Sequence, residues 1–214
     1  MQQMSKDYWK EIYKKKIIKT DPSDFAKYCL DNYFTSAQVI IDLGAGNCRD
    51  TVFFLENKLK VIAVDQSLPS MDEISDNKDI KKLILSNCKL VKNDFSKIDL
   101  KSYGKIDIYY SRWSIHAISE LKEKQLFNNI YENFREDSLF CIEVRSTKDE
   151  LFGKGKKLEK NAFYTDHYRR FIDINEFKKK IKNKFKIIYI EESNNFSKVG
   201  DNNPVLIRAI LGKI

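Results

Sequence analysis

Short apolar runs alternate along the chain with segments whose apolar residues recur at helical spacing. The runs predict seven strands, at about residues 38–43, 60–65, 88–92, 105–111, 138–144, 185–190 and 205–211. Besides a polar helical region between the second and third strands, the spacing predicts helices at about 6–16, 21–32, 48–57, 119–134 and from 173 onward. Strands that alternate with helices indicate an α/β fold with a mostly parallel sheet.

Polar residues that can cap helices mark where several of them begin. We expect Asp21-Pro22 to provide an N-cap and a first helical position, Ser119 to cap the helix after the fourth strand, and Asp173 with Glu176 to form a capping-box-like start. In the helix from Ser119 the apolar positions that repeat are Leu121, Leu126, Ile130 and Phe134. No helical pattern joins the last two strands, so we expect them to pair antiparallel.

Length and composition fit one compact domain. The chain has 214 residues, of which 42% are hydrophobic, and no Pro/Gly/Ser-rich linker divides it. We expect a single domain over 1–214, with an N-terminal helical cover at 1–35 and a substrate-side insertion at 146–172. No apolar run is long enough to span a bilayer and the N-terminus lacks the apolar core of a signal peptide, which predicts a cytoplasmic protein.

Charge and cysteine usage argue against nucleic-acid-binding, zinc-binding and disulfide-rich classes. The formal net charge is +8, and six lysines between 178 and 186 crowd one predicted helix and its exit. Aromatic residues are not interleaved with these lysines, so we interpret the region as a solvated face. Without Cys-x-x-Cys spacing, reduced thiols are predicted at Cys29, Cys48, Cys88 and Cys141.

The first predicted strand runs directly into a glycine-rich turn that opens a helix, an arrangement that binds nucleotide-like cofactors. Gly44 and Gly46 allow a tight turn and the close approach of a ligand, while the following helix presents free N–H groups. A dinucleotide site would have a third glycine where this chain has Arg49, and a guanidinium would crowd the pyrophosphate. A cofactor with a carboxylate, such as S-adenosylmethionine, would find a counter-charge in Arg49. The loop therefore favours S-adenosylmethionine over NAD.

Polar residues at the ends of the next two strands support the same interpretation. Asp65 lies 21 positions after Gly44, where an acid can accept hydrogen bonds from both ribose hydroxyls. Asn93 and Asp94 end the third strand, and Asp94 could accept from an adenine amino group. Taken singly, the glycines are also explained as a turn and the acids as strand terminators. Their order and spacing together favour a cofactor site.

These residues resemble the class I S-adenosylmethionine-dependent methyltransferases. The segment 42–47 is similar to the first motif of that family, Asp65 to its ribose-binding acid, and Asn93-Asp94 to its adenine-side motif. More narrowly, the chain resembles small bacterial methyltransferases linked to surface or capsular polysaccharide synthesis. That resemblance rests on the segments 8–13, 22–27, 44–50, 64–67, 112–118 and 167–171. One departure is Cys48, which stands where the family usually has a third glycine.

The resemblance implies a Rossmann-like, seven-stranded, mostly parallel sheet with an antiparallel last strand and helices on both faces. It also implies an N-terminal helical cover that can lie over the cofactor, although Tyr8, Trp9 and Tyr13 could equally pack the first helix onto the domain. The cofactor would be S-adenosylmethionine and its product S-adenosylhomocysteine. The expected cofactor-binding residues are Tyr13, Asp42, Gly44, Ala45, Gly46, Arg49, Asp65, Gln66, Asn93, Asp94, Phe95, Ser111 and Arg112.

Catalysis is expected beyond the ends of the fourth and fifth strands. His116, one of only two histidines, follows the fourth strand. A neutral imidazole there could take the proton of an acceptor hydroxyl as its oxygen attacks the methyl group. Alternatively, His116 packs the short helix at this point and methyl transfer relies on proximity and orientation.

The insertion at 146–172 is rich in basic and aromatic residues. Arg169 and Arg170 suit bidentate recognition of phosphate or carboxylate, which predicts an anionic acceptor. Equally, these arginines could form surface ion pairs with Asp166, Asp173 or Glu176. The expected substrate-binding residues are Trp113, Arg145, Tyr164, His167, Tyr168, Arg169 and Arg170.

The sequence thus favours an O-methyltransferase of a small anionic acceptor, such as a sugar phosphate, a nucleotide sugar or a phosphoramidate-type precursor. One alternative is N-methylation of protein or nucleic acid, although no Asn-Pro-Pro-Tyr-like motif follows Asp107. Another is a catalytically inactive regulatory protein that binds S-adenosylmethionine. We expect no metal requirement, because no His/Cys/Asp cluster has the spacing of metal ligands.

Overall fold

A computed structural model describes residues 8, 11, 21–198 and 203–214 of the chain. The strands are β1 (Val39–Leu43), β2 (Lys60–Asp65), β3 (Cys88–Lys92), β4 (Ile108–Arg112), β5 (Leu139–Arg145), β6 (Lys156–Glu159), β7 (Ala162–Tyr164), β8 (Tyr168–Arg170), β9 (Phe185–Ser193) and β10 (Leu206–Lys213). The helices are α2 (Asp24–Tyr33), α3 (Arg49–Glu56), α4 (Met71–Ile74), α5 (Lys78–Asn87), α6 (Glu120–Asn133) and α7 (Ile174–Ile181), with short 3-10 helices η1 (Phe95–Lys97), η2 (Leu100–Tyr103) and η3 (Ile115–Ala117).

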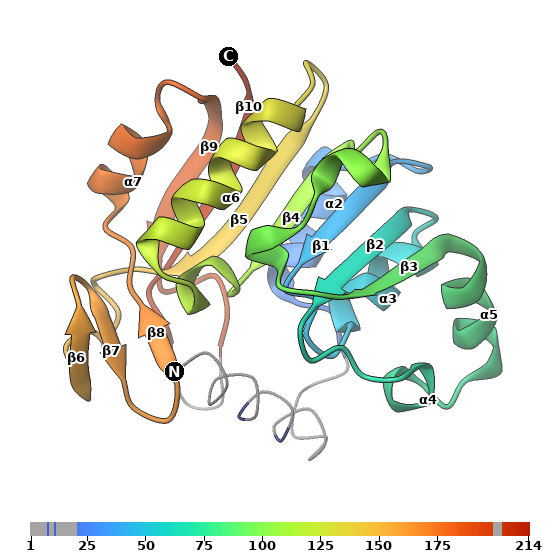
Figure 1. Cartoon of the computed structure of the whole chain (residues 1–214), viewed down its shortest axis with the longest axis horizontal. Helices are drawn as coiled ribbons and strands as arrows, with labels where there is room; N and C mark the ends of the chain where they lie inside the picture. Colours follow the sequence, from blue (N-terminus) through green and yellow to red (C-terminus); the bar gives the residue numbers. More distant parts are fainter. Residues whose placement is uncertain (1–7, 9–10, 12–20, 199–202) are drawn as a thin grey trace.

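The centre of the molecule is a seven-stranded sheet in the order β3-β2-β1-β4-β5-β10-β9 (Figure 1). The five strands β1 to β5 are parallel, and β10 pairs antiparallel with both β5 and β9. The predicted mostly parallel sheet with an antiparallel last strand is therefore confirmed. Its parallel strands end on one edge, where open α/β sheets bind their ligands.

Each face of the sheet is covered by its own apolar core. On one face, Ile41 and Tyr109 pack with the apolar sides of α6 and α7. On the other, Ile40 and Tyr110 pack with α2, α3 and α5. Figure 1 shows α6 and α7 in front of the sheet and α2 and α3 behind it. Successive side chains of a strand point to opposite faces, and burial on both faces explains the nearly unbroken apolar runs in the sequence.

The predicted start of α2 is wrong by a few residues. The helix begins at Asp24 with Ser23 as its N-cap, instead of using Asp21-Pro22. Ser23 Oγ accepts a hydrogen bond from Ala26 N (3.0 Å), and Ser23 N donates to the Asp50 carboxylate (2.7 Å). Asp50 thereby fixes where α2 starts, which is a tertiary contact that a local sequence pattern does not contain.

In α6 one of the four repeating apolar positions is not buried. Ser119 caps the helix as expected, and Leu126, Ile130 and Phe134 are buried. Leu121, however, is 66% exposed, whereas Glu123 is fully buried. Arg170 of β8 and Lys180 of α7 contact Glu123, which explains why a glutamate occupies this inward position.

The insertion forms a small sheet of its own. The strands β6, β7 and β8 pair antiparallel, and they lie beside the end of β5 and below α7 in Figure 1. Both ends of the insertion are held at β5, because Ile172 N donates to Arg145 O (2.9 Å) and Thr147 N donates to Ile172 O (3.0 Å). The insertion is therefore an ordered wall next to the carboxyl edge of the sheet.

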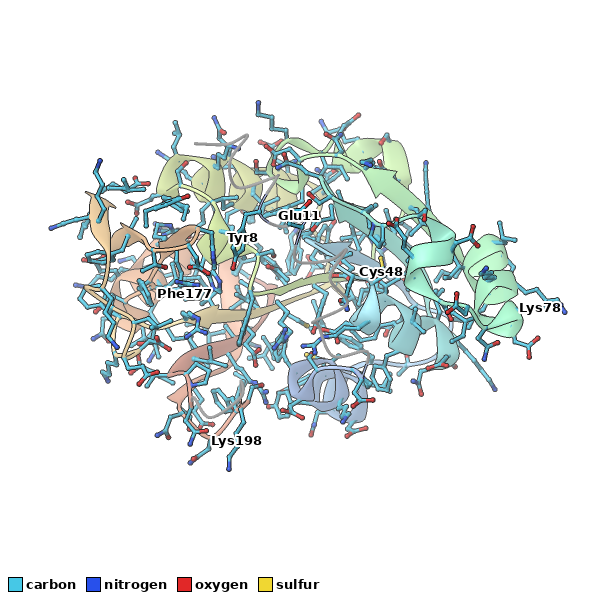
Figure 2. The ribbon with its side chains drawn as sticks, turned by 90° about the horizontal axis from the view of Figure 1, so that it is seen from below. Tyr8, Glu11, Cys48, Lys78, Phe177 and Lys198 are labelled. Carbon is cyan, nitrogen blue, oxygen red and sulfur yellow. The ribbon has the colours of Figure 1, made fainter. Side chains whose placement is uncertain are left out.

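The four cysteines are free thiols, as predicted. Figure 2 shows Cys48 within the molecule, whereas Lys78 and Lys198 lie at its periphery. Among the residues that the structure describes, no helix is long and apolar enough to cross a membrane.

Candidate functional site

The glycine turn after β1 has the backbone that its sequence predicts. Gly44 and Gly46 have φ values of 89° and 58°, in the left-handed region that favours glycine. Gly44 N and Ala45 N both donate to Val64 O, at 2.8 and 3.1 Å, so the turn is tied to the end of β2. A Cβ on Gly44 would lie 2.3 Å from Ser114 Cβ, which leaves no space for a side chain.

Cys48 lies at the end of this turn, and its φ of 64° explains why glycine is usual there. Its side chain is fully buried in the core on the α2 and α3 face. The thiol therefore packs into the protein interior. The departure at this position places strain on the backbone, because a residue with a Cβ adopts a left-handed conformation at some cost.

Asp65 reaches from the end of β2 towards the glycine turn. Its Oδ2 accepts from Gly46 N (3.1 Å) and its Oδ1 from Ser67 N (2.7 Å), and Gln66 beside it is half-buried. Burial raises the pKa of Asp65, and the two backbone N–H groups oppose that rise. The carboxylate thus lies at the carboxyl edge of the sheet, as predicted.

Asp42 lies deeper than the glycine turn. It is 3% exposed, and its Oδ2 accepts from Thr51 Oγ1 of α3 at 2.7 Å. Burial raises the pKa of Asp42 to about 7, with further contributions from Asp50 and Asp65. Its contacts make it a support that joins β1 to α3 beneath the turn.

Some of the residues expected on the adenine side form hydrogen bonds and ion pairs within the protein. Asp94 caps η1 by accepting from Ser96 N (3.0 Å), and it also pairs with Lys122 Nζ (2.9 Å). Ser96 and Lys122 lower its pKa against the effect of burial. Asn93 is exposed, and the buried Phe95 side chain lies near Gly44. Phe95 therefore borders the glycine turn, with Asp94 next to it in the chain, while the predicted Tyr13 lies outside the described residues.

Two arginines come together beside the turn. Arg49 begins α3, and Arg112 ends β4. Burial lowers the pKa of Arg49, and Arg112 lowers it further by charge repulsion. Arg49 Nε lies 3.8 Å from Asp50 Oδ1, yet Asp50 also accepts from Ser23 and from Tyr110 OH (2.9 Å). The repulsion between these two guanidinium groups favours an anion in their neighbourhood.

Trp113 lies between two guanidinium groups at the end of β4. The Arg112 guanidinium lies 4.3 Å and that of Arg145 4.9 Å from the centre of the indole ring. Trp113 has a φ of 57°, an uncommon conformation for a bulky residue. Its Nε1 is buried, and no described residue accepts a hydrogen bond from it. Ser111, at the end of the same strand, is fully buried and bonds to Ser114.

His116 is surrounded by positive charge. It is 4% exposed, and its Nδ1 accepts from Arg145 N at 3.4 Å. Burial lowers its pKa well below the ordinary value, and Arg145, Arg169 and His167 lower it further. The imidazole is therefore neutral at physiological pH.

The β7–β8 hairpin brings His167 of its loop and Arg169 of β8 to the same region. The His167 pKa is lowered to about 4, mainly by burial and then by Arg169. Arg169 lies 3.5 Å from Asp166, which is one of the surface pairs that the sequence suggested. Tyr8 stacks on His167 with ring centres 4.7 Å apart and donates to Asp166 (2.6 Å). Residue 8 and the insertion thus meet at this site.

Arg170 occupies a different place from the one predicted. Its guanidinium forms a buried ion pair with Glu123 of α6 and donates to Ile118 O at 3.1 Å. Lys180 of α7 also contacts Glu123, at 2.7 Å. Through these bonds Arg170 attaches β8 to α6. Because its guanidinium is already paired with a protein carboxylate, the geometry does not favour Arg170 as an anion clamp.

The two tyrosines of the predicted substrate set lie opposite each other in the β7–β8 hairpin. Tyr164 and Tyr168 form a cross-strand pair and are both half-buried. Tyr168 OH donates to Glu159 of β6 at 2.6 Å. That bond links β8 to β6, the two outer strands of the small sheet.

Sequence reasoning missed several acids that organise the site. Glu143 interrupts an otherwise apolar strand, and this polar residue in a buried run was the available signal. Asp149 pairs with Arg145 at 2.8 Å, four residues away, and is 3% exposed. Nothing in the spacing of Glu123 distinguishes it from the exposed polar residues of α6. No group of three or more described His, Cys, Asp or Glu residues could hold a metal ion.

Comparisons with known proteins agree with this geometry. A family model described as a methyltransferase domain matches residues 34–200, and no curated protein matches the chain. One similar solved structure is Burkholderia thailandensis 1,6-didemethyltoxoflavin-N1-methyltransferase with bound 1,6-didemethyltoxoflavin and S-adenosylhomocysteine, at 17% identity, with 91% of this chain and 80% of that chain covered and a TM-score of 0.63.

Two further structures show the same likeness. An S-adenosylmethionine-dependent methyltransferase from Clostridium acetobutylicum has 14% identity, covers 89% of this chain and 91% of its own, and has a TM-score of 0.63. The glycopeptide N-methyltransferase MtfA complexed with S-adenosylmethionine has 16% identity, coverage of 88% and 93%, and a TM-score of 0.62. At these identities the likeness concerns the fold, and the predicted cofactor agrees with the molecules bound in the first and third structures.

Proposed function

The chain belongs to the methyltransferase-domain family, and from this premise we propose that it transfers a methyl group from S-adenosylmethionine to a small anionic acceptor. The observation that carries the cofactor proposal is the left-handed glycine turn tied to the end of β2, with Arg49 at the start of α3 and Arg112 at the end of β4. An anion is favoured there, and the amino-acid carboxylate of S-adenosylmethionine supplies one.

The residues around the turn fit the other parts of this cofactor. Asp65 can accept from ribose hydroxyls, because a carboxylate has capacity beyond the two backbone N–H groups it already binds. Asp94 and Phe95 border the place for the adenine ring. When bound, S-adenosylmethionine supplies a methyl group on a positively charged sulfur, which is already activated for attack by a nucleophile.

The acceptor would lie beside Trp113, where β4, β5 and the insertion meet. Arg145 and Arg169 present positive charge here, and the Arg145 pKa is lowered mainly by burial and also by Arg169. Such a wall suits a phosphate or carboxylate group, as in a sugar phosphate, a nucleotide sugar or a phosphoramidate-type precursor.

His116 is the proposed catalytic residue. Its imidazole is neutral because of burial and the surrounding cations, which is the form that can accept a proton from an acceptor hydroxyl. A neutral imidazole is a weak base in this environment, so much of the acceleration would come from orientation of the acceptor against the methyl group. O-methylation follows from this role, and a place in surface-polysaccharide synthesis rests on the sequence resemblance alone.

N-methylation is the second candidate, since two of the similar structures are N-methyltransferases by name. The two candidates differ in the atom that is methylated, which nuclear magnetic resonance of the product identifies. A regulatory protein that binds the cofactor without turnover is the third, and it differs by having no methylated product at all.

The test is a mass-spectrometric screen of phosphorylated sugars and nucleotide sugars, with their uncharged parent sugars as matched controls. The proposal predicts a gain of one methyl group in at least one anionic compound, dependent on S-adenosylmethionine and reduced in Asp65→Ala. Methylation of the uncharged parents alone would contradict the anionic acceptor. S-Adenosylmethionine binding without any product would favour the regulatory protein.

A further inference from the structure

Three charged residues lie side by side on adjacent strands of the central sheet. In the register of the sheet, Glu143 of β5 is opposite Arg112 of β4 on one side and Arg208 of β10 on the other. Residues that face each other on neighbouring strands point to the same face and can interact. The three form a charged ladder, the Arg112–Glu143–Arg208 ladder, that leads from the proposed cofactor site into the sheet.

The two arginines do not share Glu143 equally. Glu143 Oε2 accepts a hydrogen bond from Arg208 Nε at 2.7 Å. Glu143 Oε1 lies 3.2 Å from Arg112 Nε, but neither of these two atoms has a hydrogen-bond partner among the described residues. A charge-assisted hydrogen bond is stronger than proximity alone. Glu143 is therefore hydrogen-bonded to Arg208, whereas it forms with Arg112 an ion pair that lacks a hydrogen bond.

Arg208 is fixed by a dense aromatic environment under α2. It is 5% exposed, and its guanidinium lies 5.3 Å from the ring centre of Phe25 and 4.4 Å from that of Phe196. It also donates to Phe196 O at 3.0 Å. These contacts hold Arg208 on the far side of Glu143 from Arg112, so Arg208 itself does not face the proposed cofactor.

Charge balance gives the ladder a consequence for binding. Guanidinium groups remain charged in proteins, so two arginines around one carboxylate leave one excess positive charge. Because Glu143 is bonded to Arg208, that excess is located at Arg112. We propose that Arg208 is a positioning residue that occupies Glu143 and so keeps Arg112 available for the carboxylate of S-adenosylmethionine. This inference rests on the cofactor assigned under the proposed function.

A purely structural role for the ladder makes different predictions. If the three residues only hold strands together, any change that breaks the ladder should weaken binding of every cofactor-like ligand, in proportion to the loss of folding stability. In our proposal the effect depends on the net charge left at Arg112 and on whether the ligand has a carboxylate. The two accounts therefore predict different rankings of cofactor affinity among the variants. They also predict different effects on ligands with and without a carboxylate.

The experiment is calorimetric titration with S-adenosylmethionine and with decarboxylated S-adenosylmethionine, which lacks only the carboxylate. Wild type should prefer the first ligand. Equal affinities would contradict the proposed carboxylate site itself, before any variant is made. Arg208→Met frees Glu143 to neutralise Arg112, so affinity for S-adenosylmethionine should fall about tenfold or more while that for the decarboxylated ligand stays within about threefold.

Two further variants separate charge from structure. Arg208→Met with Glu143→Gln restores one excess positive charge, and affinity for S-adenosylmethionine should return to within about threefold of wild type. Glu143→Gln alone removes the competing carboxylate, so affinity should stay at the wild-type level or rise, and this test does not require Arg208→Met to fold. Glu123→Gln, a second fully buried glutamate between two cations, is the control and should leave the ligand preference unchanged.

A tenfold loss of S-adenosylmethionine affinity in Glu143→Gln would overturn the proposal, because it would mean that Glu143 supports Arg112 directly. Equal losses for both ligands in Arg208→Met would do the same, since they would reveal general damage to the site. An unchanged affinity in Arg208→Met would show that Arg208 has no influence on Arg112.

Discussion

At the scale of single residues, His116 shows how burial and neighbouring charge together decide a protonation state. The sequence places it after the fourth strand but says nothing of Arg145, Arg169 and His167, which come from β5 and the insertion. Those groups, with burial, lower the pKa of His116 well below 6.5. The functional consequence is that His116 itself should stay neutral over the physiological range.

We predict that His116→Asn lowers kcat by about a hundredfold if proton transfer contributes, with little change in S-adenosylmethionine affinity. Between about pH 5.5 and 7.5 the wild-type kcat should show no step that the variant lacks, because the lowered pKa of His116 keeps the imidazole from titrating near 6.5. Steady-state kinetics across this range provide the measurement. A kcat near that of wild type would assign His116 a packing role, and a step near pH 6.5 that disappears in the variant would contradict the low pKa.

Asp42 carries a prediction about stability. Its pKa is about 7 in the folded protein and near 3.8 when exposed, so the folded state holds a proton that the unfolded state has lost between these values. Stability is then highest below the unfolded pKa and falls as pH rises through about 7, by on the order of a few kcal/mol. Asp42→Asn keeps an acceptor for Thr51 and removes the titration. The melting temperature of the variant should fall less than that of wild type between pH 4 and 8. An equal fall in both proteins would contradict the raised pKa of Asp42.

The positions of residues in the fold were predictable where they depend on their place along one strand or turn. Asp65, Gly44 and Arg49 could be assigned because strand ends and turns follow from local patterns, and the structure places all three at the carboxyl edge. Arg170 could not, because its partner Glu123 lies 47 residues away on another element. An arginine that clamps a ligand and one that is buried in an ion pair have the same local sequence.

At the scale of elements, the insertion is the part that the sequence described least well. β6, β7 and β8 have only three or four residues each, and their polar and aromatic residues do not form a clear alternating pattern. Their stability comes from contacts with other elements and from a cluster of Phe152, Phe163 and Phe171. The buried ion pair of Arg170 with Glu123 attaches this small sheet to α6.

Arg170→Met should therefore destabilise the protein, by about 3–5 kcal/mol, because it leaves Glu123 with less compensation in the interior. For a chain of this length the melting temperature should fall by about 10 °C. Arg169→Met should have little effect on melting, since its partner Asp166 is half exposed, but should raise the acceptor KM. Melting curves and acceptor kinetics of the two variants test this contrast. A raised acceptor KM in Arg170→Met without a loss of stability would restore Arg170 as the anion clamp.

At the scale of the whole molecule, the order of elements determined most of the fold. Alternating strands and helices predict a parallel sheet, and the last two strands without an intervening helix predict its antiparallel end. Both features depend on which elements follow one another along the chain, and sequence patterns predict that order well. The arrangement of charges across strands depends on register instead, which explains why the Arg112–Glu143–Arg208 ladder was not foreseen.

We also predict that turnover needs no metal ion, because the proposed chemistry relies on an activated methyl group and on residues of the chain. Treatment with EDTA should leave kcat and the acceptor KM unchanged within about twofold. The measurement is kinetics before and after chelation and dialysis. Loss of activity that magnesium or zinc restores would indicate a metal-assisted mechanism and would overturn this part of the account.

The measurement that tests the central claim most directly is calorimetric titration of wild type and Asp65→Ala with S-adenosylmethionine and with NAD. We predict that wild type binds S-adenosylmethionine in preference to NAD. Asp65→Ala should weaken binding by about 1.5–3 kcal/mol, because it removes a charged acceptor for two ribose hydroxyls. Asp79→Ala, at an exposed acid of α5, should bind like wild type. A wild-type preference for NAD, or unchanged affinity in Asp65→Ala, would contradict the assignment of this edge of the sheet as the cofactor site.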